Sequence, residues 1–262
     1  MILKVESFTK RYGDFEAVRG INFEIDKGEI FSIVGPNGAG KTTTVKCIVG
    51  LRKPTSGNML LNGAFSYLPE EKRLYKSYSI KRMIKVSGYM SKHFDEKRAY
   101  EFIEKFELPP DMKLANLSHG MMTQLYLAIV LSEDVDIYIL DEPTWGLDPV
   151  IRNEVLEIIR EMAINGKSFL ITTHILPEVE KVTDKVAIMN EGHFVEAGYL
   201  DELKEKYVAV VVGTNEKVED GYLYKTTSQE KIYIVERDKA GGDFQPVNFE
   251  TIFQALVKGE KE

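Results

Sequence analysis

The sequence predicts an α/β fold in which helices cover both faces of a parallel sheet. Short apolar runs at 30–34, 136–140, 168–172 and 186–189 are typical of buried strands. Segments with helical periodicity lie between these runs, and strands that alternate with helices form parallel sheets. A glycine-rich loop directly after the first run is the third indication, because such loops join a strand to a helix that binds phosphate.

The composition is that of a globular chain. The 262 residues are 44% hydrophobic and 29% charged, and the formal net charge of −7 disfavours a broad nucleic-acid-binding face, so no nucleic-acid partner is expected. The single cysteine excludes an internal disulfide, which favours a reducing cytoplasm.

No apolar run reaches the roughly 20 residues of a membrane span, and the N-terminus lacks a signal-peptide core. We therefore expect a cytoplasmic chain that reaches a membrane only through a partner.

The N-terminal half is predicted to contain a small antiparallel β subdomain, a strand–loop–helix unit and a helical insert. Residues 2–8 and 20–26 alternate between apolar and polar side chains, as half-buried strands do. The first buried strand leads through the glycine-rich loop into a helix at 42–51. Residues 78–107 show helical periodicity with many charges, so we place a helical insert at about 75–118.

The C-terminal half is predicted to complete the sheet and then to change character. Its elements are, in chain order, a helix at 121–131, a strand at 136–140, a helix at 152–164, strands at 168–172 and 186–189, further strands at 207–212, 222–226 and 231–235, and a helix at 249–257. The last four elements indicate a small α+β unit. We therefore divide the chain into a main domain at 1–207 and a C-terminal appendage at 208–262.

The strongest functional signal is the glycine-rich loop. It matches the pattern G-x-x-x-x-G-K-[ST] between a strand and a helix, and its residues are Gly35, Pro36, Asn37, Gly38, Ala39, Gly40, Lys41, Thr42 and Thr43. In such a loop, backbone N–H groups and the start of the next helix surround phosphate oxygens. We expect Lys41 to reach the β- and γ-phosphates and the Thr42 hydroxyl to bind Mg²⁺.

A second signal is a pair of carboxylates at the end of a predicted strand. Asp141 and Glu142 directly follow the run 136–140, at the sheet edge where open α/β sheets bind ligands. Behind a phosphate loop, we assign Asp141 to Mg²⁺ and Glu142 to the attacking water, as general base or polariser. A solvated acidic turn is the alternative that the pattern alone leaves open.

Two weaker signals stand at other element boundaries. Ser118, His119 and Gly120 lie just before a predicted helix, so Ser118 is either a plain N-cap or part of an anion site. His174 follows the strand at 168–172, where it is either a structural histidine or a contact of the γ-phosphate. The second interpretation of His174 requires this strand to adjoin the strand before the phosphate loop.

The order of these motifs resembles that of ABC-type ATPase subunits. A phosphate loop is followed by Leu-Ser-His-Gly-Met at 117–121, Ile-Leu-Asp-Glu-Pro at 139–143, Gly-Leu-Asp-Pro at 146–149 and Thr-Thr-His at 172–174. The resemblance implies a phosphate-loop NTPase fold of the ABC type, ATP hydrolysis, and ATP and Mg²⁺ as cofactors.

The resemblance also implies roles for individual residues. Tyr12 matches the aromatic residue that stacks on adenine, and Glu70 stands where most of the family has a glutamine that senses Mg²⁺ and water. Asp148 matches the loop that communicates across the dimer, and His174 matches the switch histidine. The implied catalytic residues are Lys41, Glu142 and His174, and the implied metal-binding residues are Thr42, Glu70 and Asp141.

The signature segment departs from the usual sequence of this family. Ser118, His119 and Gly120 match the residues that hold the γ-phosphate of ATP bound to the opposite subunit. His119 replaces the first glycine of the usual LSGGQ and Met121 replaces its glutamine, whereas the retained Gly120 allows its N–H to approach phosphate closely. With Glu70, these substitutions resemble the branch that serves drug, sodium, and polysaccharide or lipid exporters.

The resemblance therefore implies an ATP-hydrolysing subunit that energises a membrane exporter from the inner face of the cell membrane. Two such subunits, identical or not, close head to tail around two ATP molecules, and an integral membrane permease on another chain is the partner. The insert near 75–90 and the loop at Glu70 are the expected docking surface. A soluble ABC ATPase outside transport, such as an iron–sulfur assembly ATPase, stays open as an alternative, as does a regulatory ATP-binding module with little hydrolysis.

Overall fold

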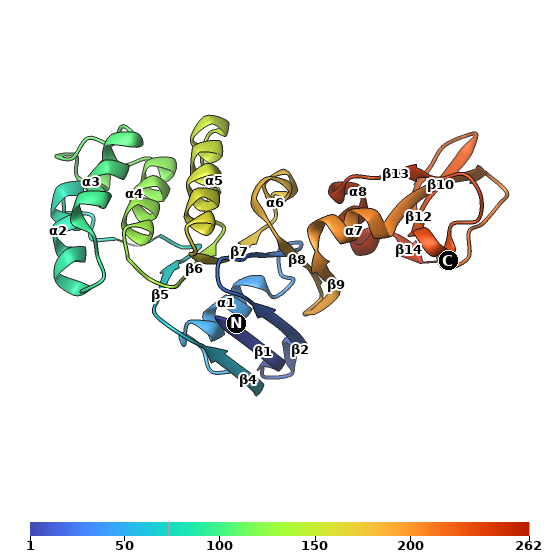
Figure 1. Ribbon diagram of the computed structural model, residues 1–262, viewed down its shortest axis with the longest axis horizontal. Helices are drawn as coiled ribbons and strands as arrows, with labels where there is room; N and C mark the ends of the chain where they lie inside the picture. Colours follow the sequence, from blue (N-terminus) through green and yellow to red (C-terminus); the bar gives the residue numbers. More distant parts are fainter. Residues whose placement is uncertain (73, 262) are drawn as a thin grey trace.

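Three sheets form the framework of the part of the chain that the structure describes. Two of them pack against each other, and the third lies at one end of the molecule's long axis. The computed structural model describes residues 1–72 and 74–261. Figure 1 shows helices α2 (Ile80–Met90) and α3 (Glu96–Lys105) at one end and the last sheet at the other, with the largest sheet between them. No helix in these ranges is long and apolar enough to cross a membrane.

The central sheet has six strands in the order β5-β6-β7-β3-β8-β9. They are β3 (Ile30–Val34), β5 (Phe65–Leu68), β6 (Ile137–Asp141), β7 (Ser168–Thr173), β8 (Lys185–Asn190) and β9 (His193–Tyr199). β3 pairs in parallel with both β7 and β8, so the strand before His174 adjoins the strand before the phosphate loop, as expected. The predicted parallel core is confirmed, and at one edge it is extended by β9, a strand that was not predicted and that runs antiparallel to β8. The two strands are joined only by Glu191 and Gly192, and both have the positive φ of a tight hairpin turn.

The two faces of the central sheet are buried by different partners. Tyr138 and Leu140 of β6 pack among residues of α2 to α5, whereas the alternate residues Ile137 and Ile139 pack among residues of β1 and β2. Figure 1 shows α4, α5 and α6 on one side of the sheet and α1 with β1, β2 and β4 on the other. Burial on both faces explains why these strands are continuous apolar runs in the sequence.

The second sheet is antiparallel and has the order β2-β1-β4. Its strands are β1 (Leu3–Tyr12), β2 (Phe15–Ile25) and β4 (Ser56–Leu61). β1 and β2 form a hairpin that is longer than the strands predicted at 2–8 and 20–26. The hairpin turn, in which Gly13 has a positive φ, places Tyr12 opposite Phe15.

The predicted helices are present in the expected order but differ at their ends, and α6 and α7 were not predicted. They are α1 (Lys41–Ile48), α2, α3, α4 (His119–Leu131), α5 (Pro149–Ile164), α6 (Leu176–Val182), α7 (Leu200–Lys206) and α8 (Phe249–Lys258), with the short 3₁₀ helices η1 (Leu114–Asn116) and η2 (Arg237–Lys239). The side chains of Ser118 and Asp148 accept hydrogen bonds from backbone N–H groups of α4 and α5, so these helices begin earlier than predicted. α1 ends before the predicted residue 51, because Gly50 adopts a positive φ.

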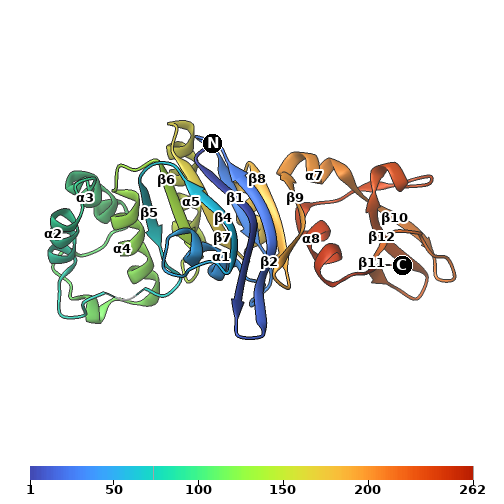
Figure 2. The same cartoon turned by 90° about the horizontal axis from the view of Figure 1, so that it is seen from below.

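The C-terminal part contains a five-stranded antiparallel sheet in the order β13-β10-β12-β11-β14. Its strands are β10 (Tyr207–Gly213), β11 (Tyr222–Thr226), β12 (Glu230–Glu236), β13 (Gln245–Pro246) and β14 (Glu260–Lys261). Phe249 and Ile252 of α8 share a hydrophobic cluster with Val34 and Ile188 of the central sheet. Figure 2 shows α8 between the two sheets. The division of the chain at 207/208 stays a prediction.

Candidate nucleotide site

The glycine-rich loop is tightly confined between β3 and α1. At Gly35, an added Cβ atom would lie 2.2 Å from the Met189 carbonyl oxygen, so no side chain fits there. Gly40 has a φ of 113°, and its Cβ would lie 2.5 Å from the Ala17 carbonyl oxygen. Gly40 also stands before α1 without a side chain that caps it. The backbone N–H groups at the start of α1 are therefore suited to bind an anion.

Lys41 folds back over the loop that it follows. Its Nζ donates hydrogen bonds to the carbonyl oxygens of Gly35 at 2.8 Å and Pro36 at 3.2 Å, and it lies 3.8 Å from Glu142 Oε1. The residue is only 6% exposed, and this burial lowers the pKa of Lys41, while Glu142 and Asp141 act in the opposite direction. A buried ammonium group beside such a loop is suited to bind a polyanion such as a triphosphate.

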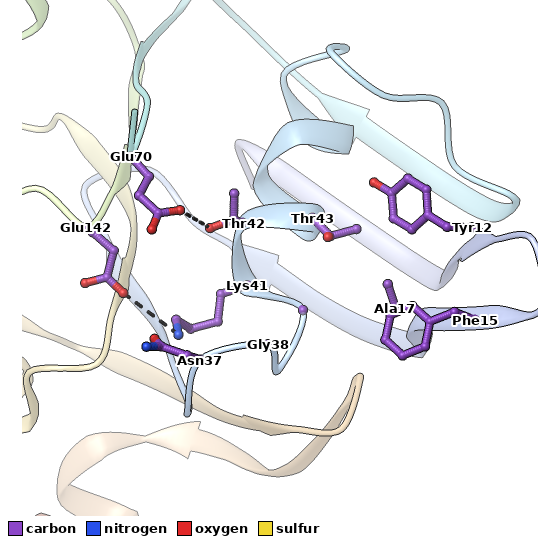
Figure 3. A pocket seen from close by; sticks show the side chains of 11 residues that line it. Tyr12, Phe15, Ala17, Asn37, Gly38, Lys41, Thr42, Thr43, Glu70 and Glu142 are labelled. Carbon is purple, nitrogen blue, oxygen red and sulfur yellow. Dashed lines mark hydrogen bonds and ion pairs between the residues drawn. The ribbon is translucent and has the colours of Figure 1, made fainter. Parts of the chain in front are cut away.

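The three predicted metal-binding residues lie together. Thr42 Oγ1 is 3.1 Å from Asp141 Oδ1 and 3.2 Å from Glu70 Oε2, and Figure 3 shows the contact with Glu70. Thr42 comes from α1, Asp141 ends β6, and Glu70 follows β5, so three elements converge on one point. A hydroxyl and carboxylates are oxygen ligands of the kind that Mg²⁺ prefers.

Asp141 has an uncompensated oxygen atom at this point. Its Oδ1 accepts hydrogen bonds from the hydroxyls of Thr42 and Thr172, whereas its Oδ2, judged against the described residues, is buried and accepts none. Burial raises the pKa of Asp141, because its charge is poorly solvated. A buried carboxylate oxygen that lacks a partner is a feature that a divalent cation would satisfy, so the residues present fit Mg²⁺.

The candidate catalytic pair is formed by two neighbouring loops. Glu142 is 7% exposed and has a φ of 52°, a left-handed conformation that is strained for a residue with a side chain. Its Oε2 lies 2.8 Å from Nδ1 of His174, which belongs to the loop between β7 and α6. A carboxylate hydrogen-bonded to an imidazole is an arrangement that can orient a water molecule and accept its proton.

An open cavity of about 370 Å³ extends from Lys41, Thr42 and Glu142 to the β1–β2 hairpin, and neither Asp141 nor His174 lines it. Figure 3 shows Lys41, Thr42 and Glu142 at one end of the site and Tyr12 with Phe15 at the other. The side chains of Tyr12 and Phe15 are 45% and 62% exposed, which leaves aromatic surface for a flat ring. Sequence reasoning missed Phe15, although the short turn between it and Tyr12 was a signal that both would lie at the tip of one hairpin.

The signature residues form a separate exposed surface. We call Ser118, His119, Gly120 and Trp145 the signature surface; His119 packs edge-on against Trp145, with their ring centroids 4.5 Å apart. Ser118 accepts a hydrogen bond from Met121 N at 3.2 Å and is the N-cap of α4. None of these residues lines the cavity at Lys41.

Asp148 also lies outside that cavity. Its Oδ1 accepts hydrogen bonds from Val150 N and Ile151 N at 2.9 and 3.1 Å, so it caps α5. The loop that contains Asp148 begins at Glu142, which connects the signature surface to the catalytic pair through a short stretch of chain. Sequence reasoning missed Trp145, whose 48% exposure only the folded chain reveals.

The sequence is similar to ATP-binding proteins of ABC transporters. A family model described as ABC transporter matches residues 18–145. An ABC transporter ATP-binding protein of Methanocaldococcus jannaschii is 32% identical over 243 residues, which cover 91% of each chain. The Nod factor export ATP-binding protein I of Burkholderia orbicola is 36% identical over 207 residues, which cover 72% of this chain and 68% of that protein. YtrB of Bacillus subtilis, an ABC transporter ATP-binding protein, is 27% identical and matches 99% of both chains.

The fold is similar to solved structures of the same kind. The ATP-binding subunit of an ABC transporter superposes with a TM-score of 0.72 and 28% identity, over 78% of this chain and 92% of that one. A dimeric ATP-binding cassette in a post-hydrolysis state, bound to ADP and Pi, superposes with a TM-score of 0.69 and 21% identity, over 76% of this chain and 98% of that one.

Proposed function

The chain belongs to the ABC transporter ATP-binding family, whose members hydrolyse ATP, and we propose that it energises a membrane exporter as one half of a head-to-tail dimer. The observation that carries this proposal is that the chain has two separate sites. One is the phosphate-loop cluster of Lys41, Asp141 and Glu142, which is buried and suited to bind and cleave a triphosphate. The other is the exposed signature surface.

The cavity and the groups around it support ATP hydrolysis in the following way. The phosphate loop and Lys41 hold the triphosphate, while Tyr12 and Phe15 offer their rings to adenine. Glu142 and His174 orient the attacking water, and Glu142 accepts its proton. Mg²⁺ held by Thr42, Asp141 and Glu70 would neutralise charge on the phosphate oxygens.

The signature surface supports the dimer. Ser118 and Gly120 stand at the exposed start of α4, outside the cavity that contains Lys41, so they are free to contact a nucleotide on a second subunit. Two copies related by a two-fold axis would each complete the other's site. The similar cassette that was solved as a dimer bound to ADP and Pi is consistent with this arrangement.

The helical insert supports a membrane partner. Tyr89 and Met90 at the end of α2 are 88% and 80% exposed, and Tyr75, which precedes the start of α2, is 67% exposed. Exposed apolar side chains of this size are typical of binding surfaces. The insert and the Glu70 loop would therefore dock a permease encoded on another chain, with the ATPase on the inner face of the membrane. The export function of the Nod factor relative favours an exporter.

A purification experiment tests the proposed partner. The tagged chain is extracted from membranes of its own source in mild detergent, and we expect a protein with several membrane spans to copurify and to change the rate of ATP hydrolysis. Tyr89→Glu should abolish both effects, whereas Tyr224→Glu, on the C-terminal sheet, should retain them. Recovery of the chain with a partner that lacks membrane spans would contradict the exporter proposal and favour an assembly ATPase.

A further inference from the structure

A buried carboxylate outside the cavity links the two catalytic loops. Glu178, in the first turn of α6, is 4% exposed, and both of its carboxylate oxygens lie 2.6 Å from the Thr144 hydroxyl. Arg152 of α5 places its Nε 3.2 Å from Glu178 Oε1, which compensates the buried charge. Burial raises the pKa of Glu178, and Thr144 and Arg152 act in the opposite direction. A carboxylate this deeply buried is destabilising unless its partners are held in place.

These contacts connect two segments that the proposed reaction needs. Thr144 lies two positions after Glu142, and Glu178 lies four positions after His174. Arg152 also donates a hydrogen bond to the Leu147 carbonyl oxygen at 3.2 Å, directly before Asp148. The loop that follows β6 is thus joined to the first turn of α6, which directly follows the loop that carries His174.

We propose that Glu178 is a positioning residue, which holds the Glu142–His174 pair in its reactive geometry through Thr144 and Arg152. This inference rests on the proposed roles of Glu142 and His174 and adds a residue that touches neither nucleotide nor water. Without the link, the two loops can move relative to each other, and the water between Glu142 and the γ-phosphate loses its alignment. Misplacement of reacting groups by about 1 Å can lower a rate by roughly 10²-fold.

The test measures ATP hydrolysis by the chain alone and uses matched substitutions. Thr144→Val removes the hydroxyl without changing the shape, and Glu178→Gln removes the charge. Both should lower kcat at least tenfold while the KM for ATP changes less than threefold, because the phosphate loop is untouched. Thr144→Ser restores the hydroxyl and should recover kcat to within threefold of the wild type. Thr183→Val removes the hydroxyl of a half-buried threonine, which lies 2.6 Å from Ser32 Oγ, and should also stay within threefold.

The outcomes separate this inference from the proposed function. Normal kcat in both Thr144→Val and Glu178→Gln, with Glu142→Gln inactive, overturns the positioning role alone. Equal losses in Thr144→Val, Thr144→Ser and Thr183→Val would show a general packing defect and would also overturn it. Turnover that survives Glu142→Gln would instead contradict the assignment of Glu142, on which the inference rests.

Discussion

The phosphate-loop cluster and the signature surface differ in how far one chain can assemble them. Lys41, Asp141 and Glu142 are at most 7% exposed and are held by hydrogen bonds and ion pairs from several elements. On the signature surface, Ser118 and His119 are exposed, and Trp145 retains 48% of its accessible area. The first region is organised within the folded chain, whereas the second presents side chains to solvent.

This difference is the reason for proposing that a second subunit takes part in the reaction. Buried charges are stable only with fixed partners, so the cluster is organised before the triphosphate arrives. The exposed start of α4 offers backbone N–H groups to an anion, but among the described residues it does not line the cavity at the phosphate loop. Substitutions in the first region should therefore impair binding or chemistry within one subunit, and substitutions in the second should impair assembly.

The largest effect on the phosphate-loop cluster is expected for Lys41→Ala. Loss of a buried charge that contacts phosphate costs about 2–5 kcal/mol, which lowers ATP affinity roughly 30- to 4,000-fold. Lys46→Ala, on the other end of α1, should bind ATP normally. Calorimetric titration with ATP measures both variants, and normal affinity in Lys41→Ala would show that the loop does not bind the triphosphate.

A large effect on chemistry rather than on binding is expected for His174→Ala. The imidazole contacts Glu142 at 2.8 Å, so its removal should slow hydrolysis by at least about 10²-fold. ATP affinity should survive, because Lys41 and the loop are intact. Phosphate release is the measurement, with the exposed His93→Ala as control. Turnover close to wild type would leave His174 a structural residue.

An intermediate effect is expected at the aromatic end of the cavity. Tyr12→Ala should cost about 1–3 kcal/mol of stacking, or roughly 5- to 150-fold in ATP affinity. Tyr12→Phe keeps the ring and should retain the affinity. Turnover at saturating ATP should change little, since adenine lies far from the reacting phosphate. If Tyr12→Ala binds ATP like the wild type, adenine stacks elsewhere, and Phe15 becomes the first alternative.

The smallest effect concerns the stability of the nucleotide-free chain. Burial raises the pKa of Asp141 in the folded state, so the ionised carboxylate destabilises the fold when the pH is above that pKa. This destabilisation disappears as the pH falls to the lower pKa that Asp141 has in the unfolded chain. Asp141→Asn should therefore stabilise the Mg²⁺-free protein at neutral pH by about 1 kcal/mol, and the difference should shrink on acidification.

Denaturant unfolding at several pH values measures this difference. The exposed Asp14→Asn serves as the control and should show no such gain. A Mg²⁺-free Asp141→Asn protein that is less stable than the wild type at neutral pH would show that the Asp141 charge is already compensated.

The sequence predicted those parts of the molecule that local rules determine. The phosphate loop and the strand Ile30–Val34 follow from glycine spacing and from an apolar run, and the structure confirms the fold that they imply. The contact between Thr144 and Glu178 joins residues 34 positions apart, and the periodicity of apolar residues in the sequence does not predict such a contact. The antiparallel β9 was missed because its turn, Glu191-Gly192, places a positive φ on a glutamate, which sequence patterns rarely assign.

The proposed dimer is tested most directly with Glu142→Gln. Glutamine is nearly isosteric with glutamate but cannot accept the proton of water, so bound ATP should persist and hold two subunits together. By size-exclusion chromatography with light scattering, we predict a monomer without nucleotide and a dimer with ATP and Mg²⁺. Adding Ser118→Arg to this variant should keep it monomeric, because the long side chain would occupy the place of the opposite phosphate. A Glu142→Gln protein that binds ATP yet stays monomeric at high concentration would contradict the closed homodimer.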